Sequence, residues 1–391
     1  MNHTKIKNLT RAMTPLVFLL MGCADPHGGK MRQSAAHSCD GIFQIVQAKA
    51  ADPDIHNASV RVTAPKNALD CERGFGSADG KNAMTSGNSF RIASIGKLLT
   101  ATAILQLIEK GKLGLGDRAA DILSLPYGSF ATLDDVDGRS YGEEITIEQL
   151  LNHSSGLLDY VFDDPRFAQR VFAHPNFQWS PTEILKAFYD LGLNQKSPFR
   201  PGTGYHYADT NFVILALVIE KLTGQAYQDA VRQLILDRVN MPDTYLERYE
   251  APRGNALLSH PFIGSMDAFS VNTSYDWGGG GFVSTPADMD RFIRALMTSS
   301  LFNSPKTLEE MEDLHPPGNT LETANNGLGL TSITIAGVKF FGHGGAWASD
   351  VLYAPSLELS VVLTLNQVDA GRDYNFMKRV VEAAIKAASA D

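Results

Sequence analysis

The chain has few cysteines, no long hydrophobic run and no excess of positive charge. Its 391 residues include three cysteines, and the net charge is −9 with a pI near 5.6. An acidic chain with no basic block beyond its N-terminal segment gives no support to nucleic acid as a partner. With 44% hydrophobic and 20% charged residues, the composition is that of a globular protein long enough for a core and two subdomains.

The common metal-binding and triad motifs are missing as well. There is no C-x-x-C, H-x-x-x-H or H-E-x-x-H, and the ten histidines are scattered, so neither a metal nor a cofactor is predicted. No G-x-S-x-G occurs, so we interpret the segment around His153 as a capped loop rather than part of a Ser–His triad. Gly278 to Gly281 lacks the Lys-Ser/Thr that follows a phosphate loop and is predicted to be a tight turn near a cleft.

The N-terminus has the pattern of an export signal. Lys5, Lys7 and Arg11 precede an apolar run of about nine residues, which is too short to span a bilayer. The run ends in Leu-Met-Gly-Cys23, which resembles the lipobox of bacterial lipoproteins, in which the cysteine is acylated. We therefore expect a signal peptide at 1–22, a lipidated tether at 23–40 and a membrane-anchored protein of the bacterial periplasm. The alternative is an ordinary secretory signal.

Two cysteines remain after Cys23. Cys39 and Cys71 are then the two cysteines left to pair with each other. Because the chain is expected in an oxidising compartment, they could form a disulfide. The alternative is a pair of buried free thiols.

Strand patterns lie at both ends of the chain and helical patterns in its middle. Strands are expected at 59–63, 71–75, 331–335, 339–342, 348–353 and 359–365, and helices at 41–51, 147–152, 181–191, 211–222, 286–297 and 373–388. Thr146 with Gln149 forms a capping box, and Thr285 caps a helix that begins with proline. We predict an α/β (α+β) domain over 41–391, with one antiparallel sheet built from both chain ends, flanking helices, an inserted helical subdomain and a cleft between them.

A serine and a lysine stand three residues apart where a polar segment turns apolar. Ser94 and Lys97 precede an uncharged stretch from Leu98 to Ile108, and Gly111 supplies a stop signal. Because residues i and i+3 share a helix face, the Lys97 amine should reach the Ser94 hydroxyl. Burial and the positive helix end should lower the pKa of Lys97 toward a neutral amine that activates the serine. The alternative is a helix cap with a solvated lysine.

Two further segments match the partners that such a serine needs. Residues 201–211 contain Tyr207, and Gly342 to Ala346 follow much later. The three motifs resemble S-x-x-K, Y-x-N and K/H-x-G of the serine hydrolases that include class C β-lactamases, D-alanyl-D-alanine carboxypeptidases and related esterases. Residues 145–158 and 279–288 resemble the family too, and the resemblance spans residue 41 to the C-terminus.

The resemblance implies a role for each matching residue. Ser94 would be the nucleophile, with Lys97 and Tyr207 sharing proton transfer as one titrating unit. The backbone N–H groups of Ser94 and Ala346 would form the oxyanion hole. Substrate binding would involve residues of the second and third motifs, namely Asp209, His343, Gly344 and Gly345, and Trp347 just after the third motif is a further candidate. Trp347 is either a cleft wall or a core residue, and which of Lys97 and Tyr207 is the base stays open.

Two departures from the family pattern bear on the substrate. Asp209 stands where the family has asparagine, and an ionised aspartate can only accept hydrogen bonds. Gly344 and Ala346 stand where related enzymes often have hydroxyl residues that hold a substrate carboxylate. Both changes weaken the case for an efficient β-lactamase.

The resemblance implies a hydrolase that cleaves an amide or ester through a Ser94 acyl-enzyme, and the N-terminal pattern implies that it is exported. A D-alanyl-D-alanine carboxypeptidase is the first expectation. A small-ester hydrolase, or a D-amino-acid amidase or aminopeptidase, is the alternative, with weak β-lactamase activity. A non-catalytic ligand-binding protein on the same fold is an alternative of another class, against which the intact Ser94, Lys97 and Tyr207 speak. The expected partners are a small-molecule or peptide substrate and the membrane, through the lipid anchor.

Overall fold

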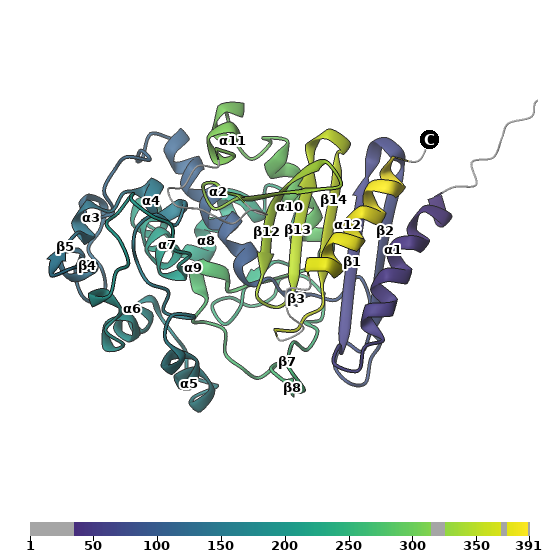
Figure 1. Cartoon of the computed structure of the whole chain (residues 1–391), viewed down its shortest axis with the longest axis horizontal. Helices are drawn as coiled ribbons and strands as arrows, with labels where there is room; N and C mark the ends of the chain where they lie inside the picture. Colours follow the sequence, from purple (N-terminus) through teal and green to yellow (C-terminus); the bar gives the residue numbers. More distant parts are fainter. Residues whose placement is uncertain (1–34, 314–324, 369–373, 390–391) are drawn as a thin grey trace, which may run out of the picture.

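A seven-stranded antiparallel sheet joins the two ends of the chain (Figure 1). A computed structural model describes residues 35–313, 325–368 and 374–389. The sheet order is β10-β11-β12-β13-β14-β1-β2, and β1 pairs with β14 from Ser59 opposite Thr364 to Thr63 opposite Ser360. In chain order the strands are β1 (Asn57–Ala64), β2 (Leu69–Gly76), β10 (Asn325–Asn326), β11 (Thr331–Ile335), β12 (Val338–Gly345), β13 (Ser349–Ala354) and β14 (Leu359–Thr364).

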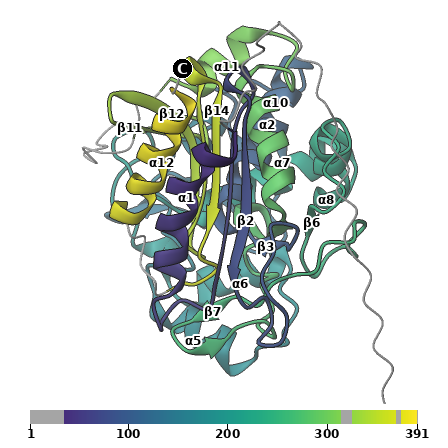
Figure 2. The same ribbon diagram turned by 90° about the vertical axis from the view of Figure 1, so that its right-hand side faces the viewer.

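Terminal helices cover one face of this sheet. Helices α1 (Ala35–Ala50) and α12 (Tyr374–Ala388) lie side by side on it, and α10 (Pro286–Met297) packs against the opposite face (Figure 2). Cys39 of α1 and Cys71 of β2 form a disulfide, which confirms the expected bridge. Helix α1 begins at Ala35, six residues before the expected domain start, so part of the expected tether is helical. Cys23 and the expected signal peptide lie outside the described residues.

The middle of the chain forms a mainly helical region beside the sheet (Figure 1). Its helices are α2 (Gly96–Glu109), α3 (Ala119–Ile122), α4 (Ile147–Leu151), α5 (Pro165–Ala173), α6 (Pro181–Asp190), α7 (Asp209–Thr223), α8 (Tyr227–Val231), α9 (Trp277–Gly280) and α11 (Pro305–Met311). Short strands join it: β3 (Phe90–Arg91), β4 (Asp135–Val136), β5 (Arg139–Ser140), β6 (Tyr245–Leu246), β7 (Phe262–Ile263), β8 (Met266–Asp267) and β9 (Phe282–Ser284). No helix in the described ranges is long and apolar enough to cross a membrane.

Local sequence signals explain where several helices begin and end. Thr146 and Gln149 form the predicted capping box of α4, and the Thr285 hydroxyl accepts the N–H of Asp288 at the start of α10. Helix α7 ends at Gly224, whose φ of 69° is left-handed. Helix α2 is buried from Gly96 to Leu107, as its uncharged sequence predicted.

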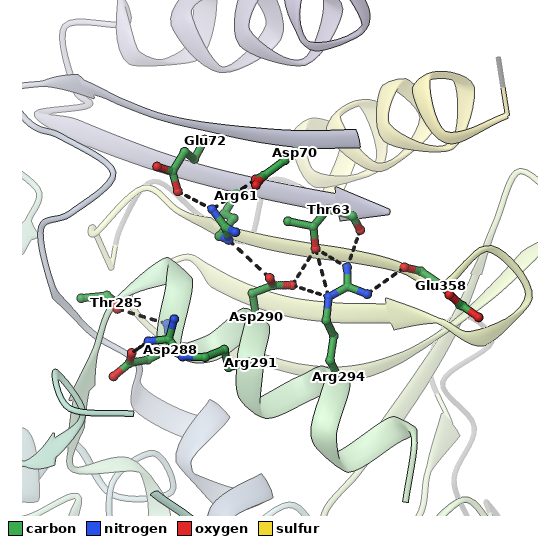
Figure 3. Close-up of polar contacts among 10 residues, drawn as sticks. All are labelled: Arg61, Thr63, Asp70, Glu72, Thr285, Asp288, Asp290, Arg291, Arg294 and Glu358. Atoms are coloured by element: carbon green, nitrogen blue, oxygen red, sulfur yellow. Dashed lines mark hydrogen bonds and ion pairs between the residues drawn. The ribbon is translucent and has the colours of Figure 1, made fainter. Parts of the chain in front are cut away.

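A polar network fixes α10 to the sheet (Figure 3). Asp290 accepts hydrogen bonds from Thr63 at 2.8 Å, Arg294 at 3.0 Å and Arg61 at 3.3 Å. Arg294 also donates to the carbonyl oxygen of Glu358 at 3.0 Å. A partly buried charge without a partner would destabilise the folded protein. Because these side chains find their partners only when α10 lies in this position, the network orients α10 on the sheet. Strand β9 directly precedes α10 and pairs with β3, just before Ser94.

Candidate active site

Ser94 lies in a single helical turn immediately before the buried helix α2. The turn covers Ala93–Ile95, and Ser94 is 9% exposed. Gly280 of α9 packs directly against this turn, since a Cβ added at Gly280 would lie 2.9 Å from the Ser94 nitrogen. Any other residue at 280 would push the two segments apart. The glycine run that the sequence predicted as a tight turn is a single helical turn that supports the candidate nucleophile.

Lys97 reaches Ser94 as the i, i+3 spacing predicted. Its Nζ lies 2.9 Å from Ser94 Oγ and donates to the Gly279 carbonyl oxygen at 2.8 Å. The side chain is fully buried and forms an ion pair with Asp209, the first residue of α7. Residues from α2, α7 and α9 therefore meet at one ammonium group.

The protonation state of Lys97 differs from the sequence-based expectation. Burial alone would lower its pKa, but Asp209 and then Tyr207 outweigh burial, so the pKa of Lys97 is raised above its ordinary value. The prediction of a neutral amine was therefore wrong. It considered burial and the helix end, whereas the nearby carboxylate stabilises the ammonium form.

Tyr207 is the third member of the site. Lys97 Nζ lies 4.9 Å from the centre of its ring. Its hydroxyl oxygen is shielded from solvent and makes no hydrogen bond of normal geometry within the described residues. Burial raises the pKa of Tyr207 to about 12, although the nearby Lys97 and Ser94 side chains oppose that shift. The resting pair therefore consists of an ammonium group and a neutral phenol.

The third motif runs along the end of β12. A Cβ at Gly345 would collide with the carbonyl oxygen of Ile92, so this glycine lets β12 approach the segment that leads to Ser94. His343 is buried, and its Nδ1 lies 2.7 Å from the carbonyl oxygen of Gly344, a contact that requires a proton on Nδ1. The expected roles of Gly344 in substrate binding, and of the Ser94 and Ala346 N–H groups in the oxyanion hole, stay predictions.

Trp347 is a core residue rather than a cleft wall. It is 4% exposed, and the Arg91 guanidinium lies 5.7 Å from its ring centre. Arg91 is itself held by Glu247, with Nε to Oε2 at 2.7 Å. The sequence left open whether Trp347 is a cleft wall or a core residue, and its burial supports the core.

Sequence reasoning missed three residues that surround this site. Burial and the charge of Asp209 raise the pKa of Asp159 well above its usual value and that of Asp276 to about 7. Asp159 accepts the backbone N–H of Asp209 at 2.9 Å, while Asp276 remains partly accessible. His153 stacks on Tyr207 with ring centres 4.3 Å apart. All three lie far from Lys97 in sequence, and no local pattern marks them.

The arrangement suits nucleophilic acyl transfer. Ser94 presents a hydroxyl that accepts a hydrogen bond from Lys97, and Tyr207 provides a second proton-transfer group. In the described part of the chain, no cluster of three or more His, Cys, Asp or Glu side chains could hold a metal ion.

The comparisons with known proteins agree with this geometry. The Beta-lactamase family model matches residues 24–385. The chain is 30% identical over 179 residues to penicillin-binding protein 4 of Amycolatopsis lactamdurans, covering 46% of this chain and 41% of that protein. It is 26% identical over 299 residues to a D-aminopeptidase of Cereibacter sphaeroides, covering 75% of this chain and 54% of that protein. The chain spans only about a third to about half of the length of three curated relatives that it matches.

The solved structures extend this likeness over nearly the whole chain. A D-stereospecific amidohydrolase from Streptomyces sp. superposes with a TM-score of 0.73 at 26% identity, covering 88% of this chain and 98% of that one. A family model that matches most of the chain, three motifs in the expected order and a shared fold lead to one conclusion: the chain belongs to the Beta-lactamase family.

Proposed function

We propose that this protein is a serine hydrolase that cleaves amides or esters through an acyl-enzyme on Ser94. The observation that carries the proposal is the contact of the buried Lys97 Nζ with Ser94 Oγ at 2.9 Å, with Asp209 and Tyr207 beside the same ammonium group. A solvated lysine near a helix cap, the alternative from sequence, would not be fully buried.

The proposed reaction has two halves. In molecules whose Tyr207 has lost its proton to solvent, Ser94 Oγ attacks the carbonyl carbon of the substrate. The serine proton passes to the Tyr207 phenolate beside Lys97 while the carbonyl oxygen becomes an oxyanion. The carbon–leaving-group bond then breaks, and the leaving amine or alcohol takes up the proton. Water attacks the resulting ester and gives its proton to the same pair. The acid leaves as Ser94 regains its hydrogen, so every proton is accounted for.

We further propose that the substrate carries a free amine or is neutral rather than anionic. Lys97 lies within hydrogen-bond distance of Ser94, but its positive charge is already paired with Asp209 and is not free to bind an anionic substrate. Asp276 is partly accessible, and burial and then the charge of Asp209 raise its pKa to about 7, so its ionised form adds negative charge beside Asp209. The names of two relatives, a D-aminopeptidase and a D-stereospecific amidohydrolase, support an amide of a D-amino acid. We therefore rank this substrate ahead of the D-alanyl-D-alanine peptide that the sequence first suggested.

Asp209→Asn should shift selectivity toward β-lactams. The asparagine could donate a hydrogen bond to a substrate amide carbonyl, whereas the carboxylate repels a substrate carboxylate. Since a contact to a charged group contributes about 1.5–3 kcal/mol, the kcat/KM ratio of nitrocefin to D-phenylalanine amide should rise at least about tenfold. Steady-state kinetics with both substrates and p-nitrophenyl acetate measure this ratio.

A second aspartate serves as the control for this substitution. Asp190→Asn changes a carboxylate at the end of α6 that pairs with Lys186 and Arg170, and it should leave the ratio unchanged. The assignment of Asp209 would be refuted by a wild-type enzyme that prefers nitrocefin to p-nitrophenyl acetate and keeps that preference in Asp209→Asn.

We also propose that the protein is exported and anchored by a lipid on Cys23. The support is the basic segment, the short apolar run and the sequence Leu20 to Cys23. When the full-length chain is expressed in a bacterium, it should fractionate with membranes and incorporate labelled palmitate, and Cys23→Ser should remove the label. Cys39→Ser is the matched control. Cys39 forms the disulfide with Cys71, so its substitution should leave the labelling intact. Equal labelling of wild type and Cys23→Ser would reject the anchor.

A further inference from the structure

His153 sits beneath Tyr207 in the loop that follows α4. The sequence suggested only a capped loop here, but the side chain is 3% exposed and the backbone has a φ of 61°. Left-handed backbone is uncommon outside glycine, although Asn, Asp and His adopt it more readily than other residues. The loop therefore holds a buried imidazole in a conformation that few side chains accept.

His153 holds the backbone on both sides of Tyr207. Its carbonyl oxygen accepts the N–H of His206 at 2.9 Å, and its Nδ1 accepts the N–H of Ala208 at 3.1 Å. These residues directly precede and follow Tyr207, and the second is next to Asp209. One residue thus fixes the short segment that brings both Tyr207 and Asp209 to Lys97.

A chain of hydrogen bonds sets the tautomer of the imidazole. The N–H of Leu157 donates to Ser155 Oγ at 3.1 Å, so the Ser155 hydroxyl can donate to Asn211 Oδ1 at 2.6 Å. That contact turns the amide nitrogen of Asn211 toward His153 Nδ1 at 3.2 Å. Two donors, from Ala208 and Asn211, therefore converge on Nδ1. Nδ1 must be unprotonated, and the neutral ring carries its proton on Nε2.

The ring also sets the orientation of the phenol. The planes of His153 and Tyr207 are 25° apart with centres at 4.3 Å, which is a stacked arrangement. Phe212 of α7 packs against the same imidazole with ring centres 5.3 Å apart. The Tyr207 ring is therefore supported on a surface that is itself braced by α7.

The charges around His153 oppose its protonation. Lys97 on α2, His343 on β12 and His206 in the preceding loop act on it, and the phenols of Tyr205 and Tyr207 face its ring. Burial, and after it the positive charge of Lys97, lowers the pKa of His153 well below 6.5, in agreement with the neutral tautomer that the hydrogen bonds require.

We propose that His153 is a positioning residue for the reaction of Ser94: a neutral imidazole whose Nδ1 and carbonyl oxygen hold residues 206–208 and whose ring orients Tyr207 toward Lys97. This inference rests on the proposed function and adds a residue to it. His153 does not exchange protons with the substrate. Its protonation would place a third N–H donor against Ala208 and Asn211 and disrupt the segment.

Three substitutions separate the hydrogen-bond acceptor from the ring. His153→Asn places Oδ1 near the position of Nδ1 and tolerates the left-handed backbone, so it keeps the acceptor. His153→Phe keeps the ring and loses the acceptor, and His153→Ala loses both. A fluorophosphonate probe counts the reactive Ser94 in each preparation, and kcat for p-nitrophenyl acetate is expressed per reactive site. This correction removes the effect of any misfolded fraction.

We expect His153→Asn to lose about tenfold or less in kcat, because it loses the support of the ring and keeps the acceptor that holds the segment. His153→Phe should lose about a hundredfold or more with little change in KM, because it loses that acceptor. If His153→Phe does not fold, the comparison is made with His153→Ala. The proposal is overturned if His153→Asn loses as much kcat per site as the other variants, or if His153→Phe keeps wild-type kcat.

A stability measurement tests the neutral imidazole without relying on activity. In the unfolded chain His153 takes up a proton as pH falls through about 6.5, whereas the folded protein keeps it neutral, so wild type loses stability in that range. The Tm of His153→Asn relative to wild type should therefore rise as pH falls from about 7 to about 5. A Tm difference independent of pH would show that His153 takes up a proton in the folded protein as readily as in the unfolded chain, and would overturn the neutral imidazole. This readout still applies if wild type proves to have no hydrolase activity.

Discussion

Ser94→Ala should abolish covalent labelling and hydrolysis together. Wild type should gain the mass of one fluorophosphonate adduct, because Ser94 Oγ is the hydroxyl in contact with the buried Lys97 ammonium. Alanine has no oxygen to form the bond, so the adduct should disappear. For amide and ester substrates, kcat should fall by roughly six orders of magnitude, the loss that follows removal of a catalytic serine. Intact-mass spectrometry and steady-state kinetics measure the two effects.

A buried serine outside the site gives the matched control. Ser284 of β9 is buried and its hydroxyl lies 2.7 Å from that of Thr244, so Ser284→Ala should keep the adduct even if the fold is weakened. An adduct that survives in Ser94→Ala would place the nucleophile elsewhere. A wild-type protein that forms no adduct and hydrolyses nothing, while binding a ligand that protects Ser94, would favour the non-catalytic alternative over a hydrolase.

The parts of the site that sequence could predict are local. The i, i+3 spacing of Ser94 and Lys97 places both on one helix face, and this contact needs only helix geometry. The capping box of α4 and the glycine at the end of α7 are similarly short-range. The pairing of the chain ends in one sheet could be inferred because strand patterns occurred only there, with helical patterns between them.

The parts that sequence could not predict depend on contacts between distant residues. The direction of the pKa shift at Lys97 follows from the balance between burial and the charge of Asp209, and spacing along the chain does not determine that balance. The stacking of His153 on Tyr207 joins residues of two loops. The burial of Trp347, which lies between β12 and β13, brings its ring against the distant Arg91 of β3. Each of these depends on tertiary packing, which overrides any local pattern.

Lys97→Ala and Tyr207→Phe should each reduce kcat by at least about a hundredfold, since each removes one half of a shared proton-transfer unit. The double variant should lose little more kcat than the less active of the two single variants, because neither residue transfers protons effectively without the other. A double-mutant cycle on p-nitrophenyl acetate, with sites counted by the fluorophosphonate probe, measures the coupling. Losses that multiply would show that the two residues act independently.

Tyr227→Phe is the control for the tyrosine. Tyr227 is also fully buried beside α2, but its hydroxyl lies 2.6 Å from the Thr100 hydroxyl rather than beside Ser94. Its replacement should cost stability and leave kcat per site near the wild-type value. A large loss of kcat in Tyr227→Phe would mean that any buried phenol near α2 matters, and that the effect of Tyr207→Phe is structural.

The pH profile then assigns the base within the pair. Asp209 holds Lys97 as an ammonium group, so the group able to accept the serine proton is the Tyr207 phenolate, whose parent phenol has a pKa of about 12. Because the phenolate fraction grows as pH approaches that value, kcat/KM of wild type should rise from pH of about 7 to about 10, and the rise should vanish in Tyr207→Phe. A profile that is flat in wild type, or that keeps its rise in Tyr207→Phe and loses it in Lys97→Ala, would assign the base to Lys97 instead.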